Sequence, residues 1–248
     1  MTGSPITVVV TTSPIPSQPS TRIIDETIAS VRHHLPDSEI ILCHDGVRPE
    51  QEARRGAYEL YMQRVLWKAD HEWGNVLPLI FDEHLHQAVC TKRALEQVRT
   101  PLILFVEGDT PLCADREIPW TEISDVILAG DANLVRFSHE ASVLDVHRHL
   151  ALDSEPQKVR GVPMTRTIQW SSRPHLASAA WYRELLDRWF PNDEKNFIEE
   201  TVYGRLVSAY ERDGDMGWLN WRTFIYTPEG DIKRSYHSDG RAGESNFV

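Results

Sequence analysis

Two acidic residues stand on either side of a glycine directly after an apolar run: Leu102 to Val106 is followed by Glu107, Gly108 and Asp109. Carboxylate oxygens suit Mg²⁺ or Mn²⁺ far better than Zn²⁺. Two such carboxylates repel each other unless a cation lies between or beside them. We therefore expect a divalent cation at Glu107 and Asp109, able to neutralise a diphosphate, with Gly108 letting the backbone approach that ligand. The alternative is that Asp109 only starts the turn Asp-Thr-Pro.

A third acidic residue follows another apolar run, because the stretch SEIILCHDGV ends in Asp45 and Gly46. In open α/β sheets, ligands bind outside the carboxyl ends of the strands. Asp45 and the pair Glu107 and Asp109 both stand at predicted strand ends. We expect them to share that edge of the sheet.

Short apolar runs alternate with helical patterns through the first 112 residues. Extended runs lie at 6–12, 38–47, 75–81 and 102–106, and helical patterns at 21–35, 49–69 and 82–100. Two of the extended runs have no polar face, which is typical of parallel strands buried on both faces. The alternation predicts an α/β fold of the Rossmann-like kind, a three-layer α/β/α sandwich with a mostly parallel central sheet.

The pattern loosens after residue 112. We expect a short helix and a strand in 121–139, a strand, loop and helix in 165–190, a helix in 194–214 and a strand in 220–230. No internal repeat or clear linker is visible. The chain, 1–248, therefore reads as one domain in two halves, with a soft division near residue 112.

The composition is that of an ordinary soluble globular protein, with 41% hydrophobic and 25% charged residues. A net charge of -11 disfavours non-specific attraction to phosphate backbones or anionic lipid. The three cysteines are an odd number without metal-like spacing, which indicates a reducing compartment. The apolar run near the N-terminus is too short for a signal peptide or membrane span, so we expect a cytoplasmic protein.

Several segments resemble GT-A-fold glycosyltransferases. VEGDTPL looks like their Asp-x-Asp motif, with Glu107 in place of the first Asp. SEIILCHDG resembles the second strand of family-2-type members, whose final Asp meets the nucleotide's base or ribose, here Asp45. HQAVCTKRALEQVRTPLILF is similar to the helix before the motif's strand, whose basic residue near the diphosphate would be Lys92 or Arg93. YHSDGR looks like the late histidine that completes the metal shell, here His237.

The resemblance covers most of residues 6–112 and then scattered points, and its weight rests on the order of the motifs. It implies transfer of a sugar from a nucleoside diphosphate donor to an acceptor hydroxyl, with Mn²⁺ or Mg²⁺ held by Asp109, Glu107 and His237. The nucleotide-sugar site it implies consists of Thr11, Asp45, Lys92, Arg93, Glu107, Gly108, Asp109 and Arg241. The Pro-rich loop after the first strand, SPIPSQPS, departs from the family pattern.

An inverting transferase also needs a carboxylate to take the acceptor's proton. Glu199 and Glu200 stand near a helix start, much like the family's acidic pair at that point. Adjacent helical residues face about 100° apart, so only one can point into the site. Glu199 is the first choice and Glu200 the second. The alternative is that both simply complement the helix dipole.

The acceptor itself is not named by any motif. Trp170, Arg173 and His175 could line an acceptor pocket, or belong to a packed loop. A small molecule, a glycan, a protein and a modified nucleic acid all stay open as acceptors. A patch of Arg160, Arg166 and Arg173 would hold the last of these.

Two other functions compete with a glycosyltransferase. A sugar nucleotidyltransferase has a related fold but needs a Gly-rich basic loop after the first strand, where this chain has prolines. A non-catalytic binding module of the same fold is the other, and Glu107 in place of Asp would fit it. His84 and His86 read either as a zinc-binding pair or as a solvated helix start.

Overall fold

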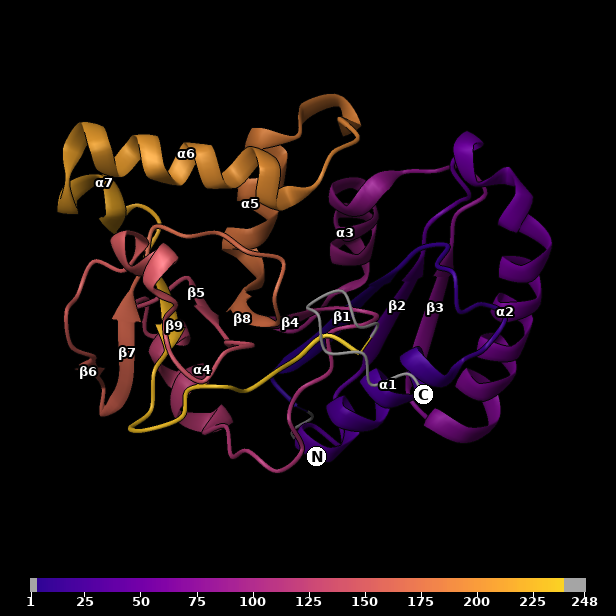
Figure 1. Cartoon of the computed structure of the whole chain (residues 1–248), viewed down its shortest axis with the longest axis horizontal. Coiled ribbons are helices and arrows are strands. Elements are labelled where there is room, and N and C mark those ends of the chain that lie inside the picture. Colours follow the sequence, from indigo (N-terminus) through magenta and orange to yellow (C-terminus); the bar gives the residue numbers. More distant parts are fainter. Residues whose placement is uncertain (1–3, 239–248) are drawn as a thin grey trace.

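A computed structural model describes residues 4–238 of the protein. Its strands form one nine-stranded sheet in the order β3-β2-β1-β4-β8-β5-β9-β7-β6 (Figure 1). They are β1 (Ile6–Thr12), β2 (Ile40–His44), β3 (Val76–Ile80), β4 (Leu102–Glu107), β5 (Leu134–Arg136), β6 (Gln157–Val159), β7 (Val162–Arg166), β8 (His175–Ser178) and β9 (Thr223–Tyr226).

Helices cover this sheet on both sides. The α-helices are α1 (Arg22–His34), α2 (Arg55–Lys68), α3 (His86–Gln97), α4 (Trp120–Leu128), α5 (Ala179–Trp189), α6 (Ile198–Asp213) and α7 (Asp215–Leu219). A 3₁₀ turn, η1 (Pro49–Arg54), leads into α2. In Figure 1, α3, α5 and α6 lie on one side of the sheet and α1 and α4 on the other, which is the predicted three-layer arrangement. Within residues 4–238, no helix is both long and apolar enough to cross a membrane.

The direction of the strands changes along the sheet. β3, β2, β1 and β4 run parallel, as predicted, with Val8 opposite both Ile40 and Leu104. β8 runs antiparallel to both β4 and β5, and β9 is parallel to β5. The second half of the sheet is therefore mixed rather than mostly parallel. Because β8 reverses between β4 and β5, the carboxyl ends of β1, β2, β4, β5 and β9 all meet at one edge.

The central strands are buried on both faces. Residues 102–106 of β4 are each at most 1% exposed, and Val8, Val9 and Val10 of β1 are fully buried. Each such side chain contributes roughly 1.5–3 kcal/mol by leaving water. The loops at the carboxyl edge are therefore attached to the most rigid part of the molecule.

Two residues predicted to line an acceptor pocket belong instead to the core. Trp170 is 3% exposed and His175 is 1% exposed. The His175 ring stacks on Phe105 and on Tyr182, with centroids 5.1 Å and 5.5 Å away, and its Nε2 lies 3.1 Å from the Tyr182 hydroxyl. Both side chains are packed, as the alternative has it, although His175 belongs to strand β8 and not to a loop, and the register of β8 places it beside Phe105 of β4.

Burial of two histidines makes the fold sensitive to acid. Burial lowers the pKa of His44 and of His175 from 6.5 to about 4. Between those values the unfolded chain binds more protons than the folded chain, so stability falls as pH drops from 6.5 to 4. The loss is about 3 kcal/mol for each histidine.

Equilibrium unfolding between pH 7.5 and pH 4 measures this loss. His175→Phe should lower the loss of stability by about 3 kcal/mol, with the contribution of His44 remaining. Equal slopes for wild type and His175→Phe would contradict the assignment.

Candidate active site

A cavity of about 780 Å³ lies at the carboxyl ends of β1, β2 and β4. One wall is the Pro-rich loop between β1 and α1, and the Gln18 side chain ties that loop to itself. Its Oε1 accepts from Ile15 N–H at 3.0 Å, and its Nε2 donates to Ser13 O at 3.1 Å. The departure from the family pattern thus forms a compact wall of the cavity.

The acidic turn after β4 forms one end of this cavity. Glu107, Gly108 and Asp109 all line it, together with Thr11, and Asp109 is only 7% exposed. Gly108 is required by the close approach of β1: a Cβ there would lie 2.8 Å from a methyl group of Thr12. The glycine at position 108 therefore has a structural reason besides the predicted approach of its backbone to a ligand.

Thr110 helps to close the turn. Glu107 N–H donates to Thr110 Oγ1 at 3.1 Å, and Thr110 N–H donates to Glu107 O at 3.0 Å. The two carboxylates are positioned by β4 and β1 at the predicted edge.

The predicted metal ligands do not form a ready-made site. Within residues 4–238, no three His, Cys, Asp or Glu side chains are grouped so as to hold a metal ion. His237 does belong to the segment beside the acidic turn, since Ser238 N–H donates to Asp109 O at 2.9 Å. Its ring, however, packs against His139 at 4.8 Å. Glu107 and Asp109 alone fit a cation whose remaining ligands are phosphate oxygens and water, the usual arrangement for Mg²⁺.

Asp45 lines the cavity, but its carboxylate already holds the loop between β3 and α3. Oδ1 accepts from Gly46 N–H at 2.9 Å and from Leu85 N–H at 2.6 Å. Oδ2 accepts from His86 N–H at 3.1 Å and lies 2.6 Å from His84 Nδ1. Three backbone N–H groups therefore donate to this carboxylate, and the His84 ring lies beside it. Asp45 therefore anchors this loop. His86 begins α3, as the helix-start alternative has it, but its side chain is half-buried and lines the cavity, whereas His84 does not line it.

The arginines that face the cavity are Arg48 and Arg54, which sequence reasoning missed. Both line it from η1 and its start. Within residues 4–238 neither side chain forms an ion pair. Burial, followed by the charge of Arg48, lowers the pKa of His86. Arg48 and Arg54 therefore bring two positive charges to a cavity that Glu107 and Asp109 also line.

Lys92 and Arg93, the predicted diphosphate contacts, do not line this cavity in the described part of the chain. Lys92 Nζ lies 3.3 Å from Asp187 and 3.5 Å from Asp193, and Arg93 Nη2 lies 2.6 Å from Asp193. The placement was wrong because α3 turns this face toward α5 and the residues after it. Arg241, another predicted contact, lies outside the described residues.

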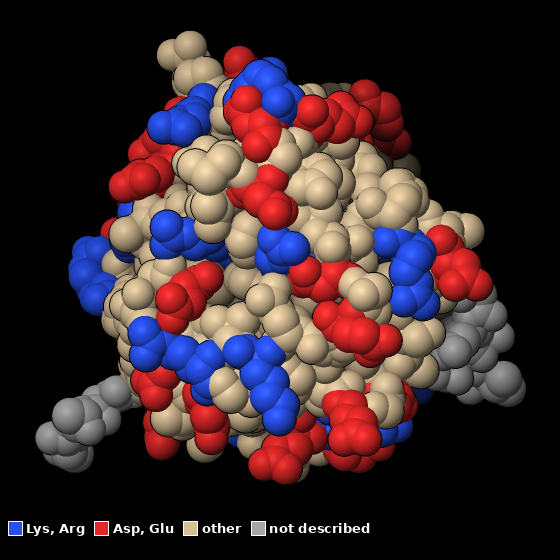
Figure 2. Space-filling model, turned by 90° about the vertical axis from the view of Figure 1, so that its left-hand side faces the viewer, with Lys and Arg blue, Asp and Glu red and all other residues tan. Residues whose placement is uncertain are grey.

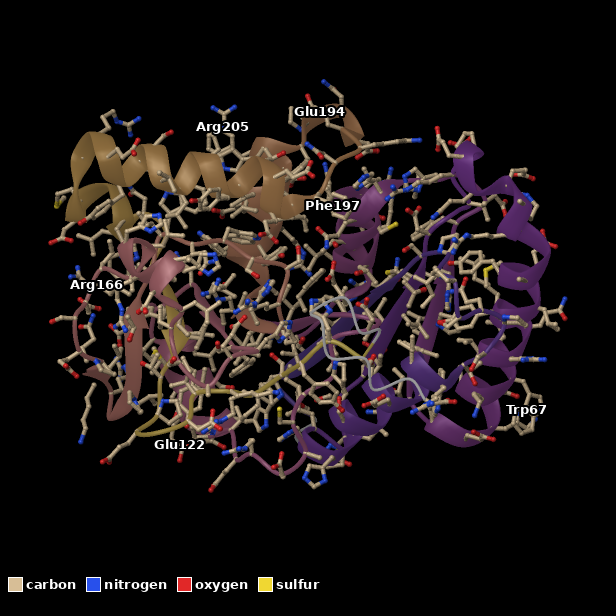
Figure 3. All side chains as sticks on the ribbon, in the orientation of Figure 1. Trp67, Glu122, Arg166, Glu194, Phe197 and Arg205 are labelled. Carbon is tan, nitrogen blue, oxygen red and sulfur yellow. The ribbon has the colours of Figure 1, made fainter. Side chains whose placement is uncertain are left out.

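The start of α6 reaches the cavity from the second half of the chain. Phe197 lines the cavity and points toward α3 in Figure 3, where its ring meets His86 at a centroid distance of 4.4 Å. Glu199 follows and accepts from Ser172 N–H at 3.0 Å through Oε2. Glu199 and Glu200 are both exposed, and neither lines the cavity in the described part of the chain. Of the two candidate bases, Glu199 is the one whose carboxylate is bonded to the loop before β8.

Arg173, predicted to bind the acceptor, forms a two-pronged ion pair with Glu140. Beside it lies Arg136, which is 3% exposed and donates to Gln169 Oε1 at 2.9 Å. Burial and the charge of Arg173 lower the pKa of Arg136 to about 9. This buried cation at the end of β5 has no sequence signal, because only the sheet order brings it near Glu199.

The predicted nucleic-acid patch is neutralised. Arg160 lies 2.5 Å from Asp131, and Arg166 lies 2.8 Å from Asp153. Figure 2 shows this end of the molecule, where basic and acidic side chains lie among one another. Arg160 and Arg166 are therefore each paired with an acid, and the acceptor class stays a prediction.

Comparisons with solved structures identify the fold. No protein-family model and no curated protein matches the chain. TarS 1–349 of S. aureus in complex with UDP-GlcNAc is 15% identical, with a TM-score of 0.56 over 98% of this chain and 61% of that one. The mannosyltransferase PcManGT of Pyrobaculum calidifontis in complex with GDP-Man and Mn²⁺ is 13% identical, with a TM-score of 0.54 over 94% and 58%. GalNAc-T7 with UDP, GalNAc and Mn²⁺ is 10% identical, with a TM-score of 0.54 over 89% and 42%.

The protein therefore has the GT-A fold that these glycosyltransferases share, as the sequence resemblance predicted. At these identities the likeness concerns the fold. The chain spans about three fifths of the length of TarS 1–349.

Proposed function

We propose that the protein is a glycosyltransferase that moves a sugar from a nucleoside diphosphate donor to an acceptor hydroxyl. The observation that carries this proposal is the cavity of about 780 Å³, which is lined by Glu107 and Asp109 and also by Arg48 and Arg54. A site with two carboxylates and two arginines suits a diphosphate bound together with a divalent cation. Structures of the same fold contain UDP-GlcNAc or GDP-Man with Mn²⁺, which supports this donor class.

The carboxylates of Glu107 and Asp109 would hold Mn²⁺ or Mg²⁺ in contact with the donor's diphosphate. A bound cation supplies charge stabilisation to the leaving diphosphate. The protein's own part is to orient the donor. The Pro-rich loop excludes water on one side, and Arg48 and Arg54 offset phosphate charge on the other. Glu199 is the proposed base for the acceptor's proton, which would give inversion.

A thermal-unfolding screen with UDP, GDP, TDP and CDP, each with and without Mn²⁺, tests this function. At a ligand concentration of about 100 Kd, binding adds about 2.7 kcal/mol of stability. That corresponds to a rise in Tm of roughly 5–10 °C for a domain of this size. No shift with any of the four would refute the donor assignment.

Turnover separates the enzyme from its two competitors. We expect slow hydrolysis of the matching nucleotide sugar in water. Binding without hydrolysis, or without transfer to any acceptor, would favour a non-catalytic module. Release of pyrophosphate from a nucleoside triphosphate and a sugar phosphate would favour a nucleotidyltransferase.

Arg48→Gln and Arg54→Gln are each expected to weaken binding of the nucleoside diphosphate about tenfold or more. A hydrogen bond to a charged group contributes about 1.5–3 kcal/mol. Arg55→Gln is the matched control, because Arg55 is paired with Glu52 and its side chain is 42% exposed. Isothermal titration measures all three. An equal loss in Arg55→Gln would show that only overall charge matters.

A further inference from the structure

We propose that Gln87 is a positioning residue that couples the acidic turn of the donor site to the start of α6, and so to Glu199. The inference rests on the proposed function and extends it to how the two halves of the chain work together. Gln87 lines the cavity, is 8% exposed, and stands at the second position of α3.

The Gln87 carboxamide joins three segments that are far apart in the sequence. Its Nε2 donates to Glu107 Oε1 at 2.7 Å, at the end of β4. The same Nε2 donates to Ser172 Oγ at 3.3 Å, in the loop before β8. Its Oε1 accepts from Ile198 N–H at 3.0 Å, at the first residue of α6. A carboxamide donates through its nitrogen and accepts through its oxygen, whereas an ionised carboxylate of the same length can only accept.

Ser172 continues the connection to the proposed base, since its N–H donates to Glu199 Oε2 at 3.0 Å. A chain of hydrogen bonds thus runs from Glu107 through Gln87 and Ser172 to Glu199. It begins in the donor half and ends in the acceptor half. It fixes the spacing between the carboxylate beside the diphosphate and the carboxylate beside the acceptor.

The first turn of α3 contacts the start of α6 in two further ways. Ala88 N–H donates to Asn196 O at 3.2 Å, and the His86 ring packs edge-on against Phe197. These contacts anchor residues 196–198 even without Gln87. Removing the carboxamide should therefore leave the fold intact and loosen only the orientation of the two carboxylates.

The test compares Gln87→Met with Gln97→Met. Both remove a glutamine amide from α3, but Gln97 is exposed at the far end of the helix and contacts neither carboxylate. In Gln87→Met we expect the affinity for the best nucleoside diphosphate with Mn²⁺ to fall about tenfold, because Glu107 loses a charged hydrogen bond. The rate of donor hydrolysis at saturating donor should fall about 10²-fold, because displacing a catalytic group by about 1 Å lowers the rate by that factor. Gln97→Met should match wild type in both.

Ser172→Ala removes the hydroxyl that accepts from Gln87 and so interrupts the hydrogen-bonded connection between Glu107 and Glu199. It should slow hydrolysis while leaving nucleotide affinity unchanged. In the double variant with Gln87→Met, Ser172→Ala should lower the hydrolysis rate by a smaller factor than it does alone, because the effects of substitutions in one hydrogen-bond network do not add. Additive effects, or a loss of affinity in Ser172→Ala, would overturn the proposal.

Hydrogen exchange gives a readout that needs no turnover. In wild type, nucleoside diphosphate with Mn²⁺ should slow exchange at residues 196–200, and Gln87→Met should abolish this response. If wild type binds nucleotide but Gln87→Met behaves as Gln97→Met, the role of Gln87 is refuted while the proposed function stands. If wild type binds no nucleotide, the proposed function fails first.

Discussion

Asp109→Asn should remove the Mn²⁺-dependent part of nucleotide binding and lower donor turnover about 10²–10³-fold, the range seen when one group that stabilises a developing charge is lost. Asparagine has nearly the same shape, so the turn after β4 should stay as it is. That turn is held by Thr110 and by the donation of Ser238 N–H to Asp109 O, and neither depends on the carboxylate. If Asp109→Asn unfolds at the same temperature as wild type, the loss reports the negative charge.

The measurement is a titration of nucleoside diphosphate with and without Mn²⁺. Wild type should bind more tightly with the ion, whereas Asp109→Asn should bind equally in both conditions. Asp115→Asn is the control, because Asp115 follows closely in the chain but its side chain is 80% exposed. Retention of the full Mn²⁺ effect in Asp109→Asn would remove the main support for a cation at this turn.

Glu199→Gln should lower turnover about 10²–10⁴-fold, which is the usual contribution of a general base. Donor affinity should stay unchanged, because the Glu199 side chain contacts Ser172 and not the cavity's acidic turn. The glutamine oxygen can still accept from Ser172 N–H, so the start of α6 should keep its position. A loss confined to turnover would mark a group that acts only in the reaction.

Glu200→Gln is the matched control for this prediction. It removes a negative charge from the adjacent residue in the same helical turn, so it weakens the interaction with the helix dipole as much as Glu199→Gln does. A pair of variants with equal activity would support the alternative in which both glutamates only complement the helix start. A larger loss of turnover in Glu200→Gln than in Glu199→Gln would make Glu200 the base.

The strands and the edge at which the acidic residues meet could be predicted because their signals are local. An unbroken apolar run such as Leu102 to Val106 allows few structures besides a strand buried on both faces. Parallel strands joined by helices then bring the residues after β2 and β4 to the same edge. The positions of Asp45 and Asp109 on the cavity follow from this rule, without knowledge of any contact between distant segments.

Helical periodicity identifies the faces of a helix but not what each face meets. Lys92 and Arg93 look suited to a diphosphate, yet α3 is rotated so that they meet Asp187 and Asp193. That rotation is set partly by Arg183 of α5, which donates to the carbonyls of Leu95 and Val98 at the end of α3. Arg48 and Arg54 face the cavity instead.

By itself, the sequence determined the α/β class, the parallel first half of the sheet and the pair of carboxylates at its edge, because each depends on neighbouring residues. Only the tertiary structure decided that Trp170 and His175 are core, that Asp45 holds a loop, and that Gln87 connects Glu107 to the start of α6. The first depends on the pairing of β8 with β4, the second on the packing of the β3–α3 loop against the end of β2, and the third on the docking of α6 against α3. Such contacts join residues tens to a hundred positions apart, and no local pattern encodes them.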